Sequence, residues 1–66
     1  MLDDALVLRE IMLELGSSAP IGVVRAKFSD RIVGRRGLVN RDRLRAARRE
    51  LGIKAYTVDG VVWLVY

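Results

Sequence analysis

The 66-residue chain contains no cysteine and no histidine. These absences exclude disulfide bonds and the zinc sites that Cys and His side chains form. They also remove the side chains that most often serve as catalytic nucleophile or general base. The adjacent carboxylates Asp3 and Asp4 lie at an expected helix start, where helix capping explains them. We therefore expect no enzyme activity, no cofactor and no metal.

Long hydrophobic runs are also missing. The longest, Val61–Tyr66, is far shorter than the roughly 20 residues that span a bilayer, and the N-terminus is acidic rather than basic, unlike a signal peptide. The segment GRRG at 34–37 lacks the lysine and hydroxyl of a phosphate-binding P-loop. We expect a cytoplasmic protein without a membrane or small-molecule partner. Residues 1–66 should form one domain of marginal stability, because so short a chain buries little surface.

Positive charge is abundant, and it is concentrated in the middle of the chain. The net charge is +4, but residues 25–54 alone hold eleven basic and three acidic side chains. The segments before and after them are net negative. Clustered positive charge attracts polyanions and accelerates their capture. A basic surface that is merely solvated is the alternative interpretation.

Two helices are predicted in the first half of the chain. The first covers 4–15, with Asp3 placed to accept hydrogen bonds from its free amides. A connection follows at 17–20. The second helix covers 22–31, and Ile21 either forms a short strand before it or begins it. The amides of Ser17 and Ser18, or those of this helix's first turn, could hold a phosphate.

The clearest element is a third helix over residues 40–51, with Asn40 as its N-cap and Gly52 at its end. At helical spacing, its apolar side chains share one face: Leu44, Ala47 and Leu51. The opposite face carries charged side chains and one small residue: Asp42, Arg45, Ala46 and Arg49.

The exposed face of this helix suits the DNA major groove. Readout there needs long donors about one turn apart, and Arg41, Arg45 and Arg49 have that spacing. Arginine matches both guanine and phosphate oxygens, and Asp42 can accept a hydrogen bond from a cytosine amine. The alternative is a surface helix whose arginines pair with Asp42 and Glu50. The excess of arginine over acid favours DNA binding.

Basic residues outside this helix add contacts of a different kind. Arg35 and Arg36 lie in the turn before it, where we expect phosphate contacts rather than base readout because a loop positions side chains poorly. A solvated loop is the alternative. Lys54 is the only basic residue of the C-terminal segment that follows the helix.

Asp59-Gly60 between two runs of β-branched residues predicts a β-hairpin. Its cross-strand pairs should be Val58 with Val61, Thr57 with Val62, Tyr56 with Trp63, and Ala55 with Leu64. Both faces are apolar, so the pattern leaves open which one is buried. We expect Tyr56 and Trp63 to serve a core or an interface rather than to stack on bases.

These elements predict an α+β fold, a winged helix-turn-helix with three helices followed by a C-terminal two-stranded β-hairpin wing. The predicted function is a module that binds double-stranded DNA, with helix 40–51 in the major groove. The residues predicted to contact DNA are Arg35, Arg36, Arg41, Asp42, Arg45, Arg48, Arg49 and Lys54.

The alternative function is protein–protein assembly through the apolar hairpin and the first helix, giving a homodimer or a larger replication assembly. The residues predicted for this interface are Leu2, Leu6, Leu13, Tyr56 and Trp63. In a competing interpretation, the hairpin and the third helix bury the leucine stripe of the first helix within one chain.

From Leu44 onward, LRAARRELGIK…GVVWLV resembles the C-terminal winged-helix segment of phage and plasmid replication proteins of the primase/RecA-like helicase kind. This resemblance covers about half the chain. It implies DNA binding in replication, with transcriptional control as the alternative, and it implies a detached module or a small stand-alone relative. The residues that match basic positions of the family are Arg45, Arg48, Arg49 and Lys54, and Trp63 matches a strand tryptophan. The turn VDGV is poorer in glycine and basic residues than the family's.

Overall fold

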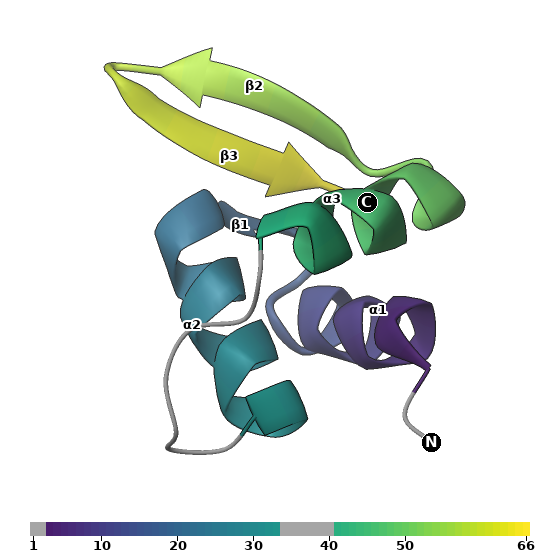
Figure 1. The fold of residues 1–66 in the computed structure, drawn as a ribbon. Coiled ribbons are helices and arrows are strands. Elements are labelled where there is room, and N and C mark those ends of the chain that lie inside the picture. Colours follow the sequence, from purple (N-terminus) through teal and green to yellow (C-terminus); the bar gives the residue numbers. More distant parts are fainter. Residues whose placement is uncertain (1–2, 34–40) are drawn as a thin grey trace.

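The computed structural model describes residues 3–33 and 41–66. Within them the chain is an α+β domain with three helices and a three-stranded antiparallel sheet. The elements in order are α1 (Asp4–Glu14), β1 (Ser18–Pro20), α2 (Ile21–Val33), α3 (Arg41–Leu51), β2 (Lys54–Val58) and β3 (Val61–Val65). Figure 1 shows the β2–β3 hairpin running across one end of the helices, with its turn projecting beyond them.

The sheet contains one strand more than the sequence predicts. Its order is β1-β3-β2, so β3 is central and the short β1 completes the sheet. The expected connection at 17–20 is therefore wrong in part, because Ser18–Pro20 pairs with β3. A three-residue strand is too short to display alternating hydrophobicity, and its pairing depends on a distant partner. Ile21, whose assignment the sequence leaves open, begins α2.

The ends of α1 follow the predicted chemistry. The Asp3 carboxylate accepts a hydrogen bond of 3.0 Å from the amide of Ala5, which confirms it as the N-cap. At the other end Gly16 has φ +80°, and the amide of Ser17 donates to the carbonyl of Met12 at 2.7 Å. This left-handed cap ends the helix one residue before the predicted boundary.

The boundaries of α3 agree with the prediction as far as the described residues reach. Asn40, the predicted N-cap, lies outside the described residues. Leu2, at the start of the chain, also lies outside them. Gly52 has φ +70°, and the amide of Ile53 donates to the carbonyl of Arg48 at 3.0 Å, which ends the helix. Leu44 and Ala47 are buried, which confirms the predicted inner face of α3.

The hairpin has the predicted turn and register. Asp59 and Gly60 both have positive φ, as a type I′ turn requires. The four predicted cross-strand pairs are all present. Leu64 and Ile53 are buried, so their side of the hairpin faces the helices. The core between the helices and the sheet consists of Leu8, Ile11, Met12, Ala19, Val24, Phe28, Leu44, Ala47, Ile53 and Leu64.

Candidate nucleic-acid interface

The outward face of α3 carries the charged residues that its helical periodicity predicts. Asp42, Arg45 and Arg49 are all exposed. The small residue between the two arginines, Ala46, is exposed as well. The backbone of Arg41 belongs to α3, but its side chain lies outside the described residues. Arg45 and Arg49 are therefore uncovered on this face of the helix.

The flank of α3 that faces α1 is neutralised by an ion pair. The Arg43 guanidinium donates two hydrogen bonds to the Asp4 carboxylate, from Nε to Oδ2 at 2.9 Å and from Nη2 to Oδ1 at 2.7 Å. These hydrogen bonds lower the pKa of Asp4 and raise the pKa of Arg43. The positive charge of Arg43 is thus paired with a carboxylate of α1.

A second ion pair ties α2 to α1. The guanidinium of Arg31, in the last turn of α2, donates a hydrogen bond to the carboxylate of Glu14 and lies 3.8 Å from a carboxylate oxygen of Glu10. The hydrogen bond lowers the pKa of Glu14 and raises the pKa of Arg31. The acidic residues of α1 therefore engage one arginine from each of the other two helices.

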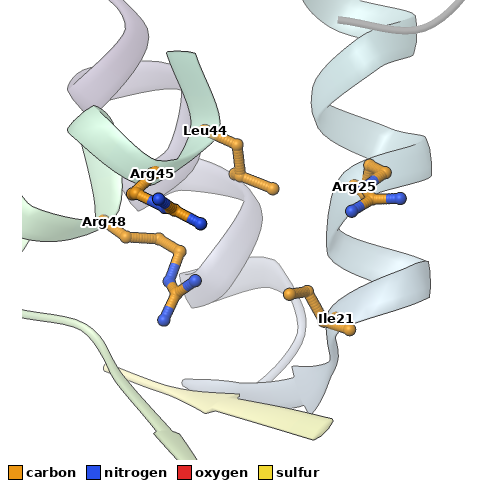
Figure 2. Close-up of a pocket in the computed structure, with 5 residues that line it drawn as sticks. All are labelled: Ile21, Arg25, Leu44, Arg45 and Arg48. Atoms are coloured by element: carbon orange, nitrogen blue, oxygen red, sulfur yellow. The ribbon is translucent and has the colours of Figure 1, made fainter. Parts of the chain in front are cut away.

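The flank of α3 that faces α2 is different. There, Arg45 and Arg48 of α3 and Arg25 of α2 line an open pocket with a volume of about 140 Å³ (Figure 2). Leu44 and Ile21 complete the lining. None of the ion pairs between described residues includes any of these three arginines. No ion pair between described residues therefore neutralises the positive charge of this flank.

Arg48 differs from the other two arginines of this pocket in having a shielded nitrogen. Its side chain is half-buried, and its Nε atom is shielded from solvent without a hydrogen-bond partner among the described residues. A buried donor without a partner costs free energy, so a partner such as a water or a bound anion is expected at this nitrogen.

The structure brings together some predicted DNA-binding residues and leaves others untested. Arg45 and Arg48 share the pocket, Arg49 is on the neighbouring exposed face, and Lys54 is exposed at the start of β2. Arg35 and Arg36 lie outside the described residues. The sequence did not identify Arg25 as a site residue. In the sequence, Arg25 is recognisable only as a residue one helical turn after Ile21. This position does not indicate that the same side of the second helix faces α3.

The predicted interface residues on α1 and the hairpin are largely uncovered. Leu6 is 53% exposed, Leu13 is 54% exposed and Tyr56 is 51% exposed, whereas Trp63 is partly buried. The interpretation that the chain itself buries the α1 stripe is therefore wrong for Leu6 and Leu13. Leu2, the third leucine of that stripe, lies outside the described residues.

Neither a membrane-spanning helix nor a similar known protein adds to the description of this site. In residues 3–33 and 41–66, no helix combines the length and the apolar character needed to cross a membrane. Comparisons with protein-family models, with curated proteins and with solved structures found nothing that matches the chain.

Proposed function

We propose that this chain is a winged-helix domain that binds double-stranded DNA through α3. The order of elements supports the fold assignment, because a short strand follows the first helix and a hairpin follows the third. The observation that carries the function is the exposed face of α3. On it, Arg45 and Arg49 project without a carboxylate partner among the described residues.

The spacing of these arginines suits a nucleic-acid duplex. Arg45 and Arg49 are four residues apart on one helix, so they are separated by about 6 Å along its axis. Successive bases of a strand are about 3.4 Å apart, and the two side chains therefore span roughly two base steps. Ala46 beside them leaves room for the helix to approach the base edges.

The charges on the two flanks orient the duplex. Because Asp4 neutralises Arg43, the α1 side of α3 offers little attraction to phosphate. The α2 side adds Arg25 and Arg48 to the exposed face. We infer that the duplex lies over α3 and extends toward α2 rather than toward α1.

The hairpin contributes little charge to this interface. Its turn contains Asp59 and no basic residue, and Lys54 lies at its opposite end. Minor-groove contacts usually use arginine or lysine. The proposed interface therefore depends on α3 and α2, and the tip of the hairpin is available for another role.

A duplex titration at two salt concentrations tests this function. If about four to six phosphates are neutralised, the logarithm of the binding constant should fall with the logarithm of salt concentration at a slope of about −4 to −5. A slope near zero, or no binding to random or genomic duplexes, would contradict the proposal. The resemblance in sequence suggests DNA replication as the process in which this binding takes place.

A second function, assembly with another copy of the chain, is favoured by the outer surface of the hairpin. Val58 and Val61 pair across its two strands, and both are exposed, as is Tyr56 on the same face. Exposed apolar residues that adjoin one another commonly mark an interaction site.

Sedimentation over a concentration series tests this second function. Val58→Lys should shift the protein toward monomer without changing its circular dichroism, and Ala26→Lys, which adds the same charge at an exposed position of α2, should not. A wild-type protein that stays monomeric at high micromolar concentration would contradict self-assembly.

A further inference from the structure

The pocket between α2 and α3 combines three features of an anion site. Three guanidinium groups, from Arg25, Arg45 and Arg48, reach it from two different helices (Figure 2). Its remaining lining consists of Leu44 and Ile21, which are apolar. The lining that the described residues form contains no carboxylate, so no acidic side chain among them competes with an anion for the guanidinium groups.

The position of the pocket at the start of α2 adds to this attraction. Ile21 is the first residue of that helix, and Arg25 is one turn further along. The N-terminal end of a 13-residue helix carries a partial positive charge. This end of α2 therefore reinforces the charge of the three arginines.

The size of the pocket limits what it can hold. Its volume is about 140 Å³, whereas sites for drug-sized ligands occupy roughly 300–1,000 Å³. A whole nucleotide or a larger cofactor does not fit such a space. A single tetrahedral oxyanion does, and guanidinium groups bind phosphate oxygens in pairs.

The shielded Nε of Arg48 is the independent sign of a missing partner. This donor has no hydrogen-bond acceptor among the described residues. Arginine pairs two of its nitrogens with one phosphate, and a phosphate bound by Nε and one terminal nitrogen of Arg48 would satisfy this donor. Binding would thereby remove the cost of the unpaired donor.

We propose that Arg25, Arg45 and Arg48 form a clamp for one phosphate of the DNA backbone, held between α2 and α3. This inference rests on the proposed DNA-binding function and adds a specific site to it. The clamp fixes the position of α3 in the groove without reading sequence, as phosphate contacts do.

The first test compares two substitutions on α2 that each remove one positive charge. Arg25→Gln removes a clamp residue, and Lys27→Gln removes an exposed charge that does not line the pocket. Arg25→Gln should weaken duplex binding about tenfold more than Lys27→Gln, equally for all sequences, which corresponds to about 1.4 kcal/mol. Equal effects of the two substitutions would overturn the clamp while leaving DNA binding intact.

The second test follows the Arg48 Nε–H resonance by NMR in the wild-type chain, so it does not depend on a variant folding. A duplex without terminal phosphates should shift this resonance, and the Arg25→Gln protein should show a smaller shift at matched occupancy. If inorganic phosphate shifts this resonance and the duplex does not, a phosphate of the DNA backbone is not the ligand. The absence of a shift with either one would also contradict the clamp. If the wild-type chain bound no duplex at all, the proposed function itself would fail, and the clamp with it.

Discussion

The two flanks of α3 carry the same kind of side chain and use it differently. On the α1 side, Arg43 is joined to Asp4 by two hydrogen bonds. On the α2 side, Arg45 and Arg48 have no such partner among the described residues and line a pocket with Arg25. The difference comes from the neighbouring helix, because α1 is acidic at its first turn and α2 is not.

This comparison separates an arginine that is paired with a neighbouring helix from arginines that have no carboxylate partner among the described residues. An exposed ion pair contributes little to stability, so the main effect of the Asp4–Arg43 pair is on where the remaining charge lies. Unpaired arginines that face one another repel, and a bound polyanion relieves that repulsion. DNA should therefore also stabilise the folded chain.

The largest effect should come from removing the exposed arginines. Arg49→Ala should weaken duplex binding by roughly 1–3 kcal/mol if Arg49 contacts bases, and Arg45→Ala should weaken binding to all sequences alike, because it removes a phosphate contact. Fluorescence anisotropy with a labelled duplex measures the change. Arg43→Ala removes the same charge from the other flank and should have a much smaller effect. Equal losses of duplex affinity for Arg43→Ala and Arg45→Ala would show that the two flanks of α3 do not differ in DNA binding.

A smaller effect of opposite sign should follow from releasing Arg43. In Asp4→Asn the guanidinium loses its carboxylate partner, so the α1 flank gains an available positive charge and duplex affinity should rise severalfold at low salt. Asp30→Asn, which makes the same change in net charge on α2, serves as the control. An increase no greater than that of Asp30→Asn would show that only net charge matters.

The smallest effect concerns stability at acidic pH. Hydrogen bonds from Arg43 lower the pKa of Asp4 below its ordinary value of 3.8, and Arg31 lowers the pKa of Glu14 in the same way. Both carboxylates contribute stability that is complete above their ordinary pKa values and is lost as the pH falls through the lowered ones. Thermal unfolding followed by circular dichroism should show a decrease of Tm in that acidic range.

Asp4→Asn should flatten part of this pH dependence and lower Tm at neutral pH by a few degrees at most. A pH profile identical to that of the wild type would mean that the Asp4–Arg43 pair does not persist in solution.

Local patterns in the sequence predicted the elements that local chemistry determines. The inner face of α3 follows from the spacing of Leu44 and Ala47, and the hairpin register follows from Asp59-Gly60, whose positive φ angles specify the turn. The exposure of Arg45 is the direct counterpart of the same helical spacing.

The features that sequence reasoning missed all depend on contacts between distant segments. Arg43 and Asp4 are 39 residues apart in the chain, and no spacing rule connects them. Ser18–Pro20 becomes a strand only because β3 pairs with it. Leu64 is on the buried side of the hairpin because that side packs against the helices. Arg25 joins the site because the first turns of α2 lie across a pocket from α3.

Chemical-shift mapping of the isotopically labelled chain with an unlabelled duplex tests the central claim most directly. The account predicts that backbone amide shifts concentrate on Arg25, Arg45, Arg48 and Arg49, while those of Asp4 and Leu13 on α1 stay unchanged. Shifts centred on α1 or on the hairpin turn, with α3 unaffected, would contradict it.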